Sequence, residues 1–126
     1  EQEYEIGKPL YDVREAGTTD INGTVVTFTP DTDIFKQTIE YSYETLSARM
    51  RELSYLNKGI KVNITDKRNK DEEGNYISEE FYSEEGLSEF VKYLDSTREQ
   101  ITADVISMEG EKNGIPVEVA MVYNNS

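Results

Sequence analysis

The sequence contains no cysteine and no histidine in its 126 residues. Without cysteine the chain can form no disulfide and no thiolate metal site, and without histidine it can hold no Ser-His-Asp triad. Any acid–base chemistry would therefore depend on carboxylates, lysine or tyrosine. Long apolar runs are missing too, whereas a membrane-spanning helix needs about 20 mostly apolar residues. We therefore expect no such helix.

Basic residues are scarce, since 13 lysines and arginines stand against 26 aspartates and glutamates, for a formal net charge of −13. Proteins bind the nucleic-acid backbone with lysine and arginine, so we expect no direct DNA contact from this acidic chain. An acidic excess is typical of solubility in a crowded cytosol. The expected location is therefore cytoplasmic, with no membrane partner.

Both ends of the chain have the features of an internal fragment. The chain begins at Glu1 without an initiator methionine and enters a strand pattern at once, and it stops at Ser126 directly after another patterned strand. Natural domains usually have looser termini. We therefore expect a fragment of a longer protein.

The first third of the chain predicts strands, because β-branched and aromatic residues alternate between turn signals. Asn22-Gly23 is a strong turn dipeptide, and Pro30 ends the segment that follows it. The expected strands are Tyr4 to Ile6, Leu10 to Val13, and Thr24 to Phe28.

The middle of the chain changes to a helical period from Tyr43 to Asn57. Ser42 is the expected N-cap, and Gly59 is placed to end the helix in a left-handed conformation. A half-buried strand follows at Ile60 to Ile64. The apolar stripe of the helix comprises Leu46, Met50, Leu53 and Leu56.

The remaining elements are a hairpin, a second helix and another hairpin. A charged turn at Asp66 to Asn75 leads to a strand at Tyr76 to Tyr82, and Ser83 is the expected N-cap of the next helix. The last two strands are expected at about Ala103 to Glu109 and Pro116 to Tyr123, with Asn113-Gly114 between them. The order of elements predicts an α+β fold with helices on one face of a mixed sheet.

No cluster of residues by itself requires an enzyme. The acidic pairs, such as Glu72/Glu73, are adjacent in sequence, and neighbours in a strand point to opposite faces. The glycines Gly110 and Gly114 lack the spacing of a phosphate-binding loop and are flanked by carboxylates. These features indicate solvated charge and a turn.

The segment Asn22 to Val26 has two interpretations. One is a hairpin turn that enters a core strand. The other is a ligand site, in which Gly23 allows close approach of the backbone, the Thr24 hydroxyl binds the ligand and Val26 packs against it.

Several blocks of the sequence resemble the B-type ATPase subunits of bacterial type II topoisomerases, namely gyrase B and topoisomerase IV B. They occur in family order and at family spacing, and together they span essentially the whole chain. The blocks are the Gly-Thr-Thr-Asp and Gly-Thr-x-Val-x-Phe-x-Pro-Asp run in Gly17 to Asp31, the Leu46 to Gly59 segment, the Gly86 to Leu94 segment and the Glu109 to Ala120 segment.

The resemblance implies a partial GHKL-type ATPase sheet with covering helices in residues 1–84. The start of a ribosomal protein S5-like transducer domain would follow in residues 85–126. The chain departs from the family pattern at Tyr82 to Gly86 and has a longer segment at Asp71 to Glu80. These departures bear on the boundary and suggest a lineage-specific subtype.

The resemblance also implies one wall of an ATP or inhibitor pocket. By position, Thr24 would bind the adenine through a shared water, Val26 would line the pocket and Gly23 would admit the ligand. The catalytic glutamate and the magnesium-binding asparagine of the family would precede Glu1. The intact subunit would use ATP and Mg²⁺, whereas this chain alone would retain no cofactor, catalytic residue or metal ligand and would hydrolyse no ATP.

For the intact protein, the resemblance implies an ATP-hydrolysing type II topoisomerase that couples ATP binding and hydrolysis to DNA strand passage and negative supercoiling. Its partners would be DNA, a gyrase A-type subunit and a second B-type subunit that dimerises with it on ATP binding. Two alternatives stay open. One is a decatenating topoisomerase IV of the same B type, and the other is a non-catalytic interaction module with a gyrase-like fold.

Overall fold

The computed structural model describes residues 1–125, which form two units, Glu1–Glu40 and the chain from Tyr41 onward. The first unit contains one small hairpin, in which β1 (Tyr4–Glu5) pairs antiparallel with β2 (Lys8–Pro9). Ile6 and Gly7 make the turn with φ angles of 49° and 74°. The predicted first strand is thus confirmed in shortened form.

Two predicted strands of this unit are wrong. The Leu10 to Val13 segment contains bends and irregular backbone, and the Thr24 to Phe28 segment is irregular throughout. The Leu10 and Arg14 amides donate to the Glu3 and Glu1 carbonyls, but these bonds do not extend into a ladder, and within residues 1–40 only β1 and β2 pair as strands. The alternating pattern alone therefore does not produce a strand here.

The second unit begins with the helix α1 (Tyr43–Leu56), which confirms the predicted helix. Its N-terminus is capped as expected, since the Ser42 hydroxyl oxygen accepts a hydrogen bond from the Thr45 amide at 3.3 Å. Such a side chain satisfies an amide that has no partner within the helix. Beyond the C-cap at Asn57, Gly59 has a φ of 83°, as a left-handed terminator requires.

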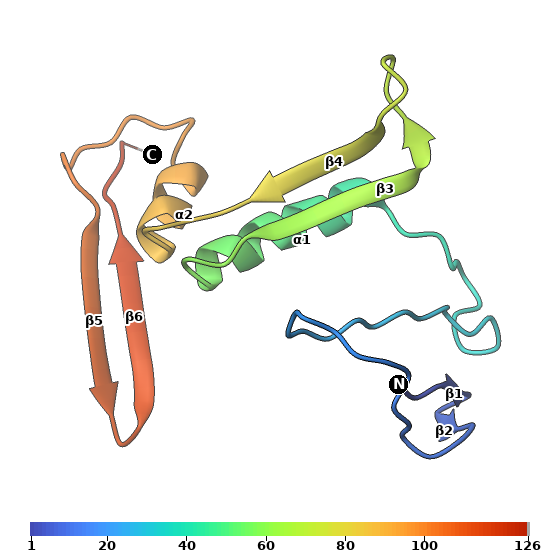
Figure 1. Cartoon of the computed structure of the whole chain (residues 1–126). Coiled ribbons are helices and arrows are strands. Elements are labelled where there is room, and N and C mark those ends of the chain that lie inside the picture. The colour runs from blue at the N-terminus through green and yellow to red at the C-terminus, as the bar shows by residue number, and fades with distance from the viewer. Residues whose placement is uncertain (126) are drawn as a thin grey trace. The chain divides into compact units, whose positions relative to one another are not determined.

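A long hairpin follows α1 and lies beside it (Figure 1). Strand β3 (Val62–Lys70) pairs antiparallel with β4 (Tyr76–Phe81), and the register shifts between Asp66 and Lys70. The turn is shorter than predicted because the strand continues through most of the charged run. At the register shift, the buried Asp66 carboxylate accepts three hydrogen bonds from Arg68, which provide local partners where the ladder pairing is interrupted.

The second helix, α2 (Leu87–Leu94), starts later than its predicted cap. Gly86 is the N-cap residue, with φ 64° and ψ −121°, and no side chain caps the helix. Ser83 is instead fully buried, and its hydroxyl oxygen accepts the Gly86 amide at 2.9 Å. Ser83 therefore organises the turn that leads into α2 and does not cap the helix itself.

The last two strands, β5 (Ile106–Lys112) and β6 (Ile115–Met121), form a regular antiparallel hairpin that lies against α2 (Figure 1). Its turn is the predicted Asn113-Gly114 dipeptide, with φ angles of 56° and 76°. Two successive positive φ angles suit the right-handed twist of the flanking strands. The predicted hairpin is confirmed, although both strands are displaced along the chain.

The α+β class is confirmed, but the described strands form three separate two-stranded hairpins and no single mixed sheet. No hydrophobic residue among residues 1–125 is buried, and the buried residues other than Gly86 are polar. The buried polar residues are Ser47, Ser54, Asp66, Ser83 and Asp95. Two-stranded hairpins are marginally stable alone, so the packing of each helix against a hairpin is the main tertiary organisation in the second unit.

Candidate functional site

The predicted ligand-binding residues Gly23, Thr24 and Val26 lie on an exposed, irregular stretch of the first unit. The side chain of Val26 is 78% exposed, and that of its neighbour Val25 is 94% exposed. Nothing lies within 4 Å of the position that a Gly23 side chain would take. The three residues are thus accessible, as the wall of an open pocket would be, and their role in binding stays a prediction.

A second candidate site is the joint between α1, strand β4 and α2, all within the second unit. The helix α1 meets its neighbours through Ser47, Arg51 and Ser54, which recur every three or four residues along one face. Both serines are buried and Arg51 is partly buried. The predicted apolar stripe, by contrast, is only half-buried and ends in the exposed Leu56.

Arg51 lies at the centre of this joint. One of its terminal nitrogens donates to the Tyr93 hydroxyl of α2 at 3.0 Å, and the other lies 3.7 Å from a carboxylate oxygen of Glu79 on β4. Its guanidinium carbon lies 5.1 Å from the ring centroid of Phe81 and 5.5 Å from that of Tyr93. One cation thus contacts two aromatic faces, a hydroxyl and a carboxylate on two different elements.

Glu79 and the buried serines complete the polar part of the joint. The Ser47 hydroxyl donates to Glu79 at 2.6 Å, and the Ser54 hydroxyl donates to the Arg51 carbonyl at 2.7 Å. These bonds satisfy hydroxyl groups that burial would otherwise leave without partners. Desolvation, reinforced by Glu79, raises the pKa of Tyr43 at the start of the same helix face.

An aromatic stack joins the same two helices. The ring of Tyr55 on α1 stacks on Phe90 of α2 with a centroid separation of 5.1 Å and an interplanar angle of 16°. It also lies 5.9 Å from Tyr93 in a tilted arrangement. Partial burial raises the pKa of Tyr55. Arg51 and this stack therefore hold α2 against α1 from neighbouring turns.

The end of α1 also contacts the segment that enters α2 and the last hairpin. The Gly59 amide donates to the Ser83 carbonyl at 2.7 Å, and the Lys58 ammonium lies 3.0 Å from Glu109 on β5. Glu109 faces Glu118 across the hairpin, and the two carboxylates repel each other there. Lys58 offsets part of that repulsion, and the hydrogen bond to Glu109 raises the pKa of the lysine.

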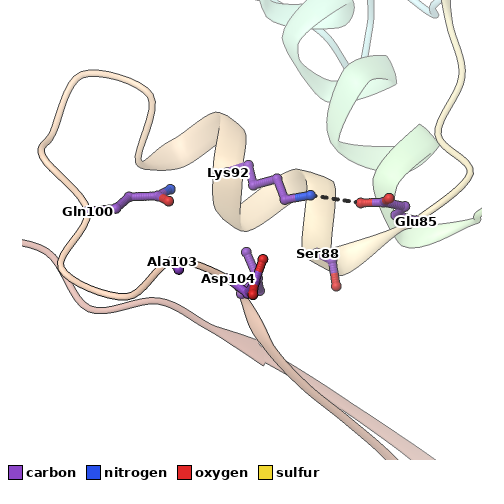
Figure 2. A pocket seen from close by; sticks show the side chains of 7 residues that line it. Glu85, Ser88, Lys92, Gln100, Ala103 and Asp104 are labelled. Atoms are coloured by element: carbon purple, nitrogen blue, oxygen red, sulfur yellow. Dashed lines mark hydrogen bonds and ion pairs between the residues drawn. The ribbon is translucent and has the colours of Figure 1, made fainter.

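A shallow hollow of about 410 Å³ lies beside α2, and Figure 2 shows the side chains around it. Lys92 points toward Glu85 and pairs with it at 2.9 Å, and the Asp104 carboxylate lies near them. The hydrogen bond to Glu85 raises the pKa of Lys92, with further contributions from Glu89 and Asp104. Because the cation that lines the hollow is already paired, the hollow does not suit a phosphate group. Its lining comprises Glu85, Ser88, Lys92, Gln100, Ala103, Asp104 and Val105.

Neither a metal site nor a membrane span is found in the described part of the chain. No group of three or more acidic side chains in residues 1–125 is arranged to hold a metal ion. Over the same residues, no helix has the length and apolar character required to cross a membrane.

Arg51 and Tyr93 are the residues that sequence reasoning missed. The helical pattern placed Arg51 off the apolar stripe, where an arginine usually faces solvent. A spacing signal was nevertheless present, because Ser47, Arg51 and Ser54 share one face of the helix. Short side chains around an arginine indicate a face that packs closely while it keeps a charge.

The fold is similar to parts of two solved gyrase structures. The B-subunit of DNA gyrase from Myxococcus xanthus matches 94% of this chain and 34% of its own, with a TM-score of 0.71 and 21% identity. The 43K ATPase domain of Thermus thermophilus gyrase B, solved in complex with an aminocoumarin, matches 75% of this chain and 24% of its own, with a TM-score of 0.62 and 24% identity. The fold is therefore that of a segment of these two gyrase B structures.

Sequence comparison identifies the family. The DNA gyrase B protein of Cytophaga hutchinsonii is 54% identical over all 126 residues, and that of Halalkalibacterium halodurans is 44% identical over 124 residues. No protein-family model matches the chain. This chain belongs to the DNA gyrase B family, and it spans 26% of the length of the Cytophaga relative and 19% of the Halalkalibacterium relative.

Proposed function

We propose that the chain is part of the ATP-operated region of a bacterial type II DNA topoisomerase of the gyrase B type. The observation that carries this proposal is the 54% identity to a gyrase B protein along the whole chain. In the intact subunit, ATP binding and hydrolysis would drive DNA strand passage and negative supercoiling. We place the end of the ATPase domain in residues 1–84 and the start of the transducer domain in residues 85–126.

The segment with Gly23, Thr24 and Val26 would form the adenine side of the nucleotide pocket. Its chemistry fits one wall of such a pocket, since it offers an exposed hydroxyl, an open backbone at Gly23 and an exposed valine. Pockets for small molecules are mostly apolar, with a few placed polar groups. The aminocoumarin bound by the Thermus ATPase domain suggests that this wall would also meet inhibitors of that class.

The remaining requirements of the reaction would be met by other parts of the intact subunit. By the family resemblance, Mg²⁺ would be held with ATP by residues of the intact subunit that precede Glu1. DNA, a gyrase A-type subunit and a second B-type subunit would be the partners. With its net charge of −13, this segment would not contact DNA itself, and the intact protein would function in the cytoplasm.

Substitution of Thr24 in the intact subunit tests the proposal. Thr24→Ala removes one hydrogen-bonding group, which in such a site costs about 1 kcal/mol, so ATP affinity should fall about fivefold. Thr24→Ser keeps the hydroxyl group and serves as the matched control. Affinity is measured by calorimetric titration with a non-hydrolysable ATP analogue.

Two outcomes would contradict the assignment. An unchanged affinity of Thr24→Ala for the ATP analogue would show that Thr24 does not bind the nucleotide. ATP turnover by the purified 126-residue chain alone would show that the catalytic groups lie within it.

A further inference from the structure

We propose that Asn22-Gly23 is a self-modification site, at which the asparagine loses its side-chain amide and an isoaspartyl residue forms beside the predicted pocket wall. The modification depends only on the local chemistry and conformation of this dipeptide, which Thr24 follows directly. Its consequence is a loss of ATP affinity with time in subunits that hold no nucleotide. That consequence rests on the proposed function.

The reaction joins two groups of the dipeptide. The Gly23 backbone nitrogen attacks the side-chain carbonyl carbon of Asn22, a new C–N bond forms, and the side-chain nitrogen leaves as ammonia together with the Gly23 amide proton. Water then opens the cyclic succinimide at either of its carbonyl groups and gives aspartate or isoaspartate. The net change is asparagine plus water to a carboxylic acid plus ammonia, and opening at the backbone carbonyl routes the main chain through the former side chain.

The sequence places glycine after asparagine at only two positions, Asn22 and Asn113. Glycine has no Cβ atom, so its nitrogen can approach the preceding side chain closely and its backbone rotates freely. Every other asparagine of the chain precedes a residue whose side chain hinders this approach. Local chemistry therefore selects two candidates, and conformation decides between them.

The backbone at Asn22 is free to reach the geometry of attack. Asn22 and Gly23 are exposed and lie in irregular backbone, and nothing lies within 4 Å of the position that a Gly23 Cβ would take. Within residues 1–125 neither of them takes part in a hydrogen bond, and the nearest bonds join the Thr19 hydroxyl to the backbone of Ile21. Rotation of the chain between Asn22 and Gly23 therefore breaks no hydrogen bond.

Asn113 has the same neighbour but a restrained conformation. Asn113 and Gly114 have φ angles of 56° and 76° in the turn of hairpin β5–β6, and the ladder pairs Lys112 with Ile115 across that turn. A hairpin turn of this length depends on positive φ at both central residues. Attack by the Gly114 nitrogen would require the Asn113 backbone to rotate out of the turn and the flanking pair to open. Asn113 is therefore a matched control in the same chain.

The product would alter the predicted pocket wall in two ways. An isoaspartyl linkage lengthens the main chain immediately before Gly23 and so displaces the Thr24 hydroxyl group. It also adds a carboxylate beside a site proposed for an anionic nucleotide, and like charges repel. A bound nucleotide would in turn slow the reaction, because contacts with Gly23 and Thr24 would oppose rotation of the backbone.

The test uses the full-length subunit, aged in mildly alkaline buffer with and without a non-hydrolysable ATP analogue. Alkali promotes removal of the glycine amide proton and so makes the nitrogen a better nucleophile. Peptide mapping by mass spectrometry quantifies acid formation at Asn22 and at Asn113, and calorimetric titration then gives the affinity for the analogue. Asn22→Gln keeps an amide but closes a ring less readily, and Gly23→Ala hinders the attacking nitrogen.

We expect Asn22 to convert at least about fivefold faster than Asn113, because opening the flanking pair of the hairpin costs about one hydrogen bond. Gly23→Ala should slow conversion at Asn22 about tenfold and leave Asn113 unaffected. Without the analogue, conversion should weaken ATP affinity about fivefold through loss of the Thr24 hydrogen bond. Asn22→Gln should keep its initial affinity on ageing, and the analogue should protect Asn22 but not Asn113.

Conversion of Asn22 no faster than that of Asn113 would overturn the modification site, whether or not the protein binds ATP. Fast conversion that the analogue does not slow, with unchanged affinity, would uphold the modification site and refute the proposed pocket wall. An equal loss of affinity on ageing in Asn22→Gln and in the wild type would overturn the link between the modification and ATP binding.

Discussion

Gly86 is the position in this chain where one methyl group should have the largest structural effect. Its φ of 64° and ψ of −121° are disfavoured for residues with a Cβ atom. An added Cβ would lie 3.3 Å from the Tyr55 carbonyl oxygen and 3.3 Å from the Lys58 Cβ. Gly86→Ala therefore strains the backbone and also crowds the end of α1.

The free-energy cost of the backbone strain and that of the crowding can be given separately. A non-glycine residue in a sparsely populated backbone region costs about 1 to 3 kcal/mol. Crowding of a packed position typically adds about 1 kcal/mol or more, and here the neighbouring backbone carbonyl cannot move without disturbing α1. Gly86→Ala should thus lower the free energy of unfolding by about 2 to 4 kcal/mol.

Two other glycines provide matched controls. Gly74 has a φ of 86° but nothing within 4 Å of an added Cβ, so Gly74→Ala should show the backbone cost alone. Gly110 has open space and no positive φ, and alanine in a strand is favoured over glycine by about 0.5 to 1 kcal/mol. Gly110→Ala should therefore be neutral or slightly stabilising.

The assay is urea unfolding of the intact subunit, monitored by circular dichroism, with the midpoint compared at constant m-value. The expected order of stability is Gly110→Ala, then Gly74→Ala, then Gly86→Ala. If Gly86→Ala is as stable as Gly74→Ala, the close approach of the α1 end to the start of α2 does not contribute. If it is as stable as the wild type, neither backbone strain nor crowding acts at this junction.

Two further predictions concern the second unit. The side-chain and backbone hydrogen bonds from Arg68 lower the pKa of the Asp66 carboxyl from 3.8 to about 2. The stability that Asp66 contributes is therefore complete above pH 3.8 and lost as the pH falls through about 2. Urea midpoints measured across that range should fall in the wild type and fall less in Asp66→Asn; parallel curves would contradict the assignment. Ser42→Ala should destabilise α1 by about 1 kcal/mol, whereas Ser42→Asp should retain the cap. Equal urea midpoints for Ser42→Ala and the wild type would exclude a capping role.

The sequence by itself predicted the elements whose signals are local. The helix after Ser42, its end near Gly59 and the turn at Asn113-Gly114 depend on hydrogen bonds and φ angles within a few residues. The family resemblance was also visible in short blocks of residues, and the comparisons confirm it. Local chemistry determines these features, whatever the rest of the protein does.

The tertiary structure decided which side chains meet. The alternating Thr24 to Phe28 segment forms no strand, because a strand depends on a neighbour that the pattern cannot supply. The buried face of α1 carries Ser47 and Ser54 and not the leucine stripe, because contact with hairpin β3–β4 and with α2 selects it. Arg51 meets Glu79 on β4 and also Tyr93, which lies 42 residues further along the chain, and only folding brings such distant groups together.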